Sequence, residues 1–257
     1  MKYPIKLLLI PLVFVLLTSA SLKGEDLGIY ENLDTFLPAD LTFTDENGNT
    51  VQLLSLIDKP TVISLVYYEC PGLCSPLLEG VADVINKTNL DLGSEYQVFT
   101  ISFDPEEGTE LALGKKISYS KLIENKDVAN GWKYFTGNQE NITKLLNALG
   151  YKIKEAGSEY IHPAAIMVVS PKGKITRYLH GTYFLPFDLK MAVAEAMDGK
   201  SGPTINKVLR YCFSYDPEGQ KYVLNITKIS GTMILILALS LFGGLVLKNK
   251  KNKTQKA

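Results

Sequence analysis

Cysteine and histidine are scarce in this chain of 257 residues, which holds three cysteines and two histidines. An odd number of cysteines excludes a framework in which every thiol is paired, so at least one thiol is free or functional. The two histidines, His162 and His180, are the only sources of an imidazole ligand. The chain also lacks internal repeats, and its only low-complexity run is at the C-terminal end, which leaves room for one main domain.

Acidic residues are absent from both ends of the chain. Residues 1–20 and 248–257 hold none of the 27 acidic residues but seven of the 27 basic ones. The part between them therefore carries 20 basic and 27 acidic side chains, a net charge of about −7. Binding to nucleic acid requires a basic surface, so we expect no nucleic-acid partner.

Residues 1–20 have the features of a secretory signal peptide. Lys2 and Lys6 precede an apolar run of 11 residues, and the small residues at 18–20 suit cleavage. Such a run is too short to span a bilayer, so we expect a signal peptide, with an uncleaved N-terminal anchor as the alternative.

A second apolar segment, residues 229–247, contains no charged residue. As an α-helix, its 19 residues extend about 28 Å, close to the ~30 Å hydrocarbon core of a bilayer. Residues 248–257 carry five lysines, which the positive-inside rule keeps in the cytoplasm as a basic tail. We therefore expect a single-pass protein of the cell (inner) membrane with a C-terminal transmembrane helix. Its functional domain then faces the periplasm or the cell exterior, joined to the helix by a juxtamembrane segment over residues 201–228.

Strand and helix patterns alternate between the two ends. Residues 21–36 form a polar, irregular lead-in, and residues 37–200 form the domain. Strands that alternate with helices and finish in a hairpin predict an α/β sandwich with a mixed central sheet. The predicted strands are a hairpin over 41–51 and the segments 61–67, 97–103, 132–136, 164–169 and 174–179. The predicted helices are 74–87, 109–124, 139–149 and 186–197.

Cys70 and Cys74 lie where a buried strand turns into a helix. The positive end of that helix favours a thiolate over a thiol. If Cys74 lies on the first turn, the i, i+4 spacing brings the two Cβ atoms within roughly 5–6 Å. This separation suits two sulfurs that share one metal ion and, after a small rotation, also a disulfide. The motif leaves both chemistries open.

The order strand, Cys-x-x-x-Cys, helix resembles the thioredoxin superfamily, whose plain members have two residues between the cysteines. With Ser102-Phe-Asp-Pro105 at a strand end and Glu159-Tyr-Ile-His162 before a strand, the chain resembles the Sco/SenC copper-chaperone family over residues 37–198. The resemblance implies a thioredoxin-like fold and a site for Cu(I), Cu(II) or both. Members of the family bind copper through two cysteines and a distant histidine, which correspond here to Cys70, Cys74 and His162.

The same family assists assembly of the binuclear copper centre in subunit II of cytochrome c oxidase, by copper delivery or thiol reduction. The resemblance therefore implies a membrane-anchored copper chaperone with that subunit as partner and with a copper donor or thiol reductant upstream. The alternative is an extracytoplasmic thiol–disulfide oxidoreductase with Cys70 and Cys74 as catalytic residues. Thiolates that bind copper also exchange disulfides, so the two functions are compatible.

The sequence also predicts the roles of several residues near these motifs. Ile161 occupies the position where the family often has an aspartate before the ligand histidine, which removes a carboxylate that could orient the ring. His180 is expected in a loop, and Glu106 and Glu107 are expected to stabilise the start of the following helix. A cis peptide bond before Pro163 is an open alternative, because thioredoxin-like folds often place a cis-proline opposite the thiols.

Cys212 lies in a Tyr-rich stretch ahead of the apolar segment. We expect a small apolar residue packed at this elbow, and an intermolecular disulfide or a thiol relay to the motif cysteines are the alternatives.

Overall fold

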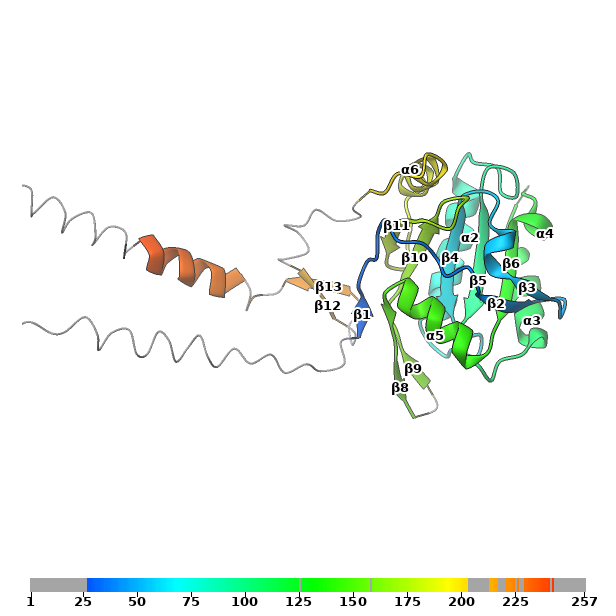
Figure 1. The fold of residues 1–257 in the computed structure, drawn as a ribbon, viewed down its shortest axis with the longest axis horizontal. Coiled ribbons are helices and arrows are strands. Elements are labelled where there is room, and N and C mark those ends of the chain that lie inside the picture. Colours follow the sequence, from blue (N-terminus) through cyan, green and yellow to red (C-terminus); the bar gives the residue numbers. More distant parts are fainter. Residues whose placement is uncertain are drawn as a thin grey trace, which may run out of the picture.

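The computed structural model describes residues 27–124, 126–157, 159–202, 213–216, 221–224, 226, 229–240 and 242. The predicted signal peptide, Cys212 and the basic tail lie outside the described residues. The description below concerns the α/β domain, where the thiols and His162 are found (Figure 1).

A mixed sheet of seven strands forms the centre of the domain, in the order β11-β10-β4-β5-β6-β2-β3. The three central strands run parallel, while β10 and β2 on either side of them run antiparallel to their neighbours. The mixed sheet predicted from the sequence is therefore confirmed. In spatial order, the strands are β11 (Ile175–His180), β10 (Ala165–Val169), β4 (Thr61–Val66), β5 (Gln97–Ser102), β6 (Trp132–Thr136), β2 (Thr42–Asp45) and β3 (Thr50–Gln52).

Strands β4, β5 and β10 are buried along their whole length. The buried residues include the polar Ser64 and Thr100, whose hydroxyls hydrogen-bond to each other at 2.8 Å. A strand covered on both faces has a nearly continuous apolar sequence, and this explains the β-branched run of β4.

The helices pack around this sheet. Helix α2 contacts both α3 and α6, α6 also contacts β10 and β11, and α3 contacts β6 and β2. The N-cap Asn138 starts α5 by accepting a hydrogen bond from the backbone N–H of Asn141. The bounds are η1 (Leu53–Leu56), α2 (Cys74–Lys87), α3 (Thr109–Ser120), α4 (Val128–Gly131), α5 (Gln139–Ala148) and α6 (Pro186–Met197).

Gly150 ends the α5 region as the sequence predicts, and its φ of 59° is in the left-handed range. A Cβ atom there would lie 1.8 Å from the carbonyl oxygen of Tyr30. This close contact ties the N-terminal lead-in to the domain. The lead-in, which the sequence predicted to be irregular, also contains a short strand, β1 (Gly28–Ile29). This strand pairs with β7 (Tyr151–Lys152).

Two further strand pairs were not predicted. The hairpin of β8 (Lys154–Ala156) and β9 (Glu159–Ile161) projects from the body of the domain in Figure 1. The other pair is β12 (Phe213–Asp216) with β13 (Lys221–Leu224). Strands of two to four residues carry too little hydrophobic periodicity to be recognised in a sequence.

The predicted segments of the main sheet and of its long helices are confirmed, with ends that differ by a few residues. Helix α3 stops at Ser120 rather than at 124. The expectation of a loop at His180 is wrong, because this residue ends β11 and pairs with Ala165 of β10.

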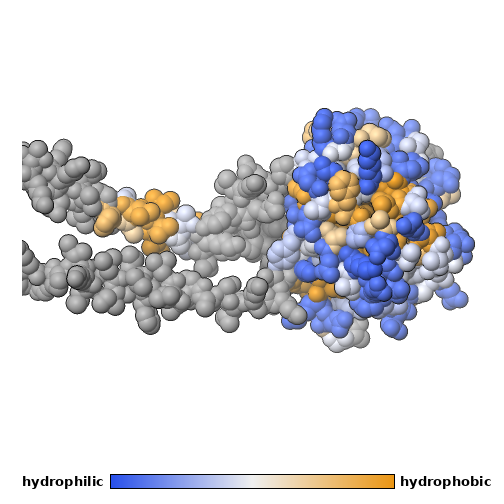
Figure 2. Space-filling model, viewed as in Figure 1, coloured by the Kyte–Doolittle hydropathy of each residue, from blue (hydrophilic) through white to orange (hydrophobic). Residues whose placement is uncertain are grey.

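Part of the apolar segment 229–247 is described, and residues 229–240 and 242 are helical. Within the described residues, no helix combines the length and the apolar character that crossing a bilayer would require. In Figure 2 this helix is hydrophobic on its surface, whereas the visible face of the domain is largely hydrophilic around a central apolar area.

Candidate metal centre

The structure brings together the three side chains that the resemblance selected. The Sγ atoms of Cys70 and Cys74 and a ring nitrogen of His162 all lie within 4.8 Å of one another. Cys74 and His162 are 88 positions apart in the sequence. Two thiols and one imidazole at this spacing form a donor set suited to a soft metal ion.

The pairing of two strands explains how His162 reaches the thiols. Strand β10 runs antiparallel to β4, with Ile166 opposite Ser64. The start of β10 therefore lies beside the end of β4, where the loop to α2 begins. Cys70 lies in this loop, and His162 precedes β10 by three residues.

Cys70 is held as a thiolate at the start of α2. Its Sγ accepts hydrogen bonds from the backbone N–H groups of Gly72 and Cys74, each at 3.4 Å. The hydrogen bond from the Cys74 thiol is the largest of the effects that lower the pKa of Cys70 to about 3. His162 and the two backbone donors add to it, against partial burial. The sequence-based prediction of a thiolate at this helix end agrees with this geometry.

Cys74 is the protonated member of the pair. It is 4% exposed, and burial together with the negative charge of Cys70 raises its pKa well above the ordinary value for a thiol. The two cysteines are not joined in a disulfide. One half-exposed thiolate and one buried thiol are thus available either to a metal ion or to an exchange reaction.

His162 presents its Nε2 atom to the sulfurs. This atom lies 3.4 Å from Sγ of Cys74, while Nδ1 lies 3.1 Å from the hydroxyl of Tyr151 and 3.0 Å from the carbonyl oxygen of Pro163. The hydroxyl of Tyr151 also donates to that carbonyl oxygen. A carbonyl oxygen only accepts, so a proton on Nδ1 satisfies it and leaves the lone pair of Nε2 free for a metal ion.

Tyr151 is a functional residue that sequence reasoning missed. It belongs to β7, is buried, and orients the His162 ring from the side of Nδ1. Ile161, directly before the histidine, offers no polar group. The structure instead supplies the orienting hydroxyl from 11 positions upstream. No local motif connects the two residues, so only the fold reveals the contact.

An aromatic wall surrounds the imidazole. The rings of Tyr67 and Phe103 meet the His162 ring edge-on, with centroids 6.0 and 5.2 Å away. Tyr160 packs edge-on against both of these residues. These rings keep water from His162, which is 5% exposed, while Cys70 stays partly open to solvent.

The prediction that Glu107 stabilises the start of a helix is wrong. Helix α3 begins at Thr109, and the Glu107 carboxylate is buried against the thiol loop instead. It accepts hydrogen bonds from the backbone N–H groups of Tyr68 and Glu69 at 2.7 Å and from the hydroxyl of Ser102 at 2.5 Å. Burial raises the pKa of Glu107 despite these donors. These two N–H groups lie just beyond the end of β4 and have no strand partner, so they require another acceptor. The carboxylate of Glu107 provides it.

Two further expectations about this region are corrected. No peptide bond is cis among the described residues, so the suggestion of a cis bond before Pro163 is wrong. His180 is not part of the group of three ligands. Its Nε2 lies 3.0 Å from a carboxylate oxygen of Glu31, and both side chains are nearly buried.

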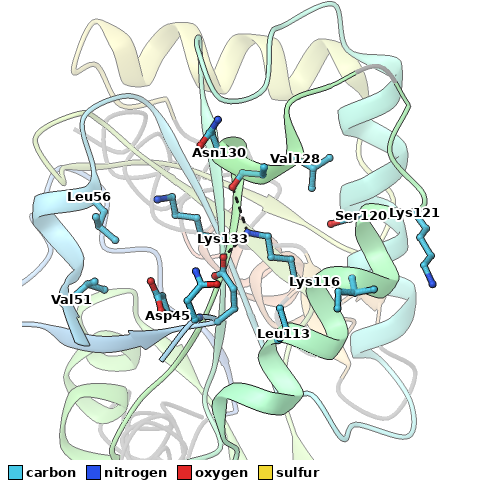
Figure 3. Close-up of a pocket in the computed structure, with 14 residues that line it drawn as sticks. Asp45, Val51, Leu56, Leu113, Lys116, Ser120, Lys121, Val128, Asn130 and Lys133 are labelled. Atoms are coloured by element: carbon cyan, nitrogen blue, oxygen red, sulfur yellow. Dashed lines mark hydrogen bonds and ion pairs between the residues drawn. The ribbon is translucent and has the colours of Figure 1, made fainter. Parts of the chain in front are cut away.

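A hollow of about 740 Å³ lies elsewhere on the domain, beside α3, α4 and the β2–β3 turn. Figure 3 shows Lys133 and Lys116 among its lining residues, with Lys116 in contact with Glu46 and with the carbonyl oxygen of Ala129. The hollow contains no cysteine or histidine. It is therefore separate from the candidate metal centre.

A protein-family model matches the sequence of the domain. Residues 32–198 match the model described as SCO1/SenC. The chain belongs to the SCO1/SenC family. It is also similar to the SCO1 protein homolog of Bacillus subtilis (strain 168), with 24% identity over 148 residues, which is 57% of this chain and 75% of the relative.

Solved structures show the same thioredoxin-like fold. A protein of Aquifex aeolicus VF5, provisionally assigned to electron transfer, is 30% identical with a TM-score of 0.59 over 66% of this chain and 96% of its own. BsSco, a member of the Sco family of cytochrome c oxidase assembly proteins, is 22% identical, with a TM-score of 0.52 over 65% of this chain and 96% of its own. Arabidopsis thaliana ScoI, crystallised with copper bound, is 18% identical, with a TM-score of 0.51 over 63% of this chain and 99% of its own.

The lowered pKa of Cys70 predicts an unusual reactivity profile. Because its thiolate persists at neutral and mildly acidic pH, the rate of alkylation by iodoacetamide stays nearly constant from pH 8 down to about pH 5. The rate falls only as the pH approaches 3, whereas an ordinary thiol with a pKa of about 8.5 already loses reactivity below pH 8. Peptide mapping by mass spectrometry identifies the labelled cysteine. A rate that falls tenfold per pH unit below pH 8 would contradict the assignment.

The contacts of Glu107 predict a stability cost for Glu107→Gln. In the wild type, the backbone N–H groups of Tyr68 and Glu69 each donate to one carboxylate oxygen of Glu107. The glutamine amide replaces one of these oxygens with an NH₂ group, which cannot accept. We therefore expect a loss of about 1–3 kcal/mol in the free energy of unfolding. Thermal unfolding of the reduced protein measures it. Glu106→Gln is the matched control, because Glu106 is exposed and its loss costs within about 0.5 kcal/mol. Equal unfolding temperatures for the two variants would refute the role of Glu107.

Proposed function

We propose that this chain is a membrane-anchored copper chaperone that assists assembly of the binuclear copper centre in subunit II of cytochrome c oxidase. The observation that carries the proposal is the approach of two sulfurs and one imidazole nitrogen to within 4.8 Å of one another. Family membership and the copper-bound structure of ScoI support copper as the cargo. The relationship of BsSco to cytochrome c oxidase assembly supports the acceptor.

The donor set suits both oxidation states of copper. Two thiolates favour Cu(I), and the imidazole of His162 also suits Cu(II). Binding displaces the proton of Cys74, so uptake of the ion releases protons and strengthens as pH rises. Three protein ligands leave coordination positions open, at which a ligand of the acceptor can attack and remove the ion.

The proposed location rests on the two ends of the chain. A signal peptide at residues 1–20, the apolar segment 229–247 and the basic tail 248–257 together support a single-pass protein of the cell (inner) membrane. The domain then lies on the periplasmic or exterior side of that membrane.

A second function is favoured by the unequal protonation of the two thiols. Cys70 is a partly exposed thiolate, while Cys74 is a buried thiol behind it. In a thiol–disulfide exchange, the Cys70 thiolate attacks one sulfur of a partner disulfide and releases the other sulfur as a thiolate. Cys74 then loses its proton and displaces the first partner sulfur. The partner disulfide is reduced to two thiols, and the Cys70–Cys74 pair becomes oxidised.

Copper titration tests the chaperone proposal on the full chain in detergent, under anaerobic conditions. We expect one ion per chain, and we expect His162→Ala to weaken Cu(II) binding by more than about 100-fold, because outer-sphere partners alone contribute 10–100-fold. Cu(I) binding is retained through the two sulfurs. His180→Ala is the matched control, since His180 pairs with Glu31 and not with the thiols. Unchanged Cu(II) affinity in His162→Ala would overturn the proposal.

Trapping of mixed disulfides tests the exchange function. Cys74→Ser leaves the attacking thiolate without a resolving partner, so mixed disulfides between Cys70 and a partner accumulate on non-reducing gels. Both variants also carry Cys212→Ser, which removes the third thiol of the chain. Cys70→Ser then traps none, because the remaining thiol of Cys74 is buried and protonated. Trapping by Cys70→Ser and not by Cys74→Ser would reverse the assigned order of attack.

A further inference from the structure

Helix α6 buries one apolar side and also exposes large apolar residues on the other, among the charged Asp188, Lys190 and Glu195. Leu189, Ala192 and Val193 belong to the side buried against the domain. On the solvent side, Phe187 and Met191 are 68% and 38% exposed. A surface helix normally presents mainly polar and charged residues on its outer side, and large apolar residues gathered there are typical of an interaction surface.

The segment before α6 extends this exposed surface. In an extended run around the buried Phe184, Tyr183 and Leu185 are 64% and 49% exposed. Close packing holds the run in place, because a Cβ atom on Gly80 of α2 would lie 1.8 Å from the carbonyl oxygen of Thr182. We call the exposed apolar residues the α6 surface: Tyr183, Leu185, Phe187, Met191, Ala194 and Met197.

The two parts of the α6 surface meet at the C-terminal end of α2. The ammonium group of Lys87, the last residue of α2, lies 5.9 Å from the centre of the Tyr183 ring. The ammonium group of Lys190 on α6 lies 3.4 Å from the side-chain oxygen of Asn89, two positions further along. Two lysines therefore border the α6 surface, and one of them, Lys87, is also ion-paired with Asp83 at 2.8 Å.

We propose that the α6 surface docks onto the phospholipid surface of the membrane that anchors the chain, an inference that rests on the proposed membrane anchor. Met197, the last residue of α6, lies 32 positions before Ile229, where the apolar segment begins. A connection of this length lets the α6 surface reach the bilayer in which the apolar segment is proposed to lie. Exposed aromatic and aliphatic residues with neighbouring lysines are typical of interfacial helices, which bury their apolar side about 5–10 Å into the headgroup region.

Docking in this way determines where the metal centre points. Tyr183 lies beside Lys87 at one end of α2, and Cys74 is the first residue at the other end. A helix of 14 residues is about 20 Å long. The thiols therefore lie at the end of α2 that is remote from the lipid, where a soluble domain of a partner can reach them.

Fluorescence quenching by brominated lipids tests the docking on the full chain in phosphatidylcholine vesicles. The single native tryptophan, Trp132, is fully buried, so an indole introduced by Phe187→Trp reports on the α6 surface. We expect vesicles with bromine at the upper acyl positions to reduce its emission by about half, because interfacial side chains lie near that depth. Ile117→Trp is the matched control, since Ile117 is 50% exposed on α3 and we expect no quenching there.

The outcomes separate docking from anchoring. Flotation of the protein with vesicles reports the anchor, and copper titration reports the metal centre. If the protein floats with vesicles and binds copper but shows no quenching at position 187, the docking proposal is wrong and the proposed function is unaffected. An emission shift of Phe187→Trp that depends on protein concentration and not on lipid also overturns it, because a second copy then covers the surface. Loss of quenching when Met191→Glu is added supports docking.

Discussion

The antiparallel pairing of β10 with β4 is the constraint on which the candidate metal centre depends. It places the start of one strand beside the end of the other, so the loop that carries the thiols and the residue before β10 meet at the same edge of the sheet. Both strands are fully buried, and a shift in register would disrupt the close packing of their side chains on both faces of the sheet. The same burial that stabilises the domain therefore holds the imidazole within reach of the two sulfurs.

Around this meeting point, buried polar groups direct the functional atoms. Glu107 binds the backbone before Cys70, and Tyr151 with the carbonyl of Pro163 orients the His162 ring. The first turn of α2 supplies the N–H of Cys74 to the Cys70 sulfur. Each donor or acceptor comes from a different element of the domain, so the site is a property of the packed fold and not of the thiol loop alone. Copper binding and disulfide exchange both draw on the unequal protonation that results.

Much of the architecture was predictable from the sequence, because its long elements carry strong patterns. The β-branched run of β4 and the apolar spacing of α2 identified the strand-to-helix turn, and Gly150 marked the end of the α5 region. The prediction failed where elements are short or contacts are remote. The strand β1 has two residues, and the turn of Glu107 towards the thiol loop depends on N–H groups nearly forty positions away.

By itself the sequence determined the thiol pair at a helix start, the scarcity of imidazole, the family resemblance and the apolar segment near the C-terminus. These features depend on local patterns of hydrophobicity, charge and spacing, which need no knowledge of the fold. Only the tertiary structure decided that His162 and not His180 faces the sulfurs, that Tyr151 orients it, and that α6 exposes large apolar residues on its outer side. These outcomes depend on strand register and on the packing of distant side chains, and local spacing does not encode either of them.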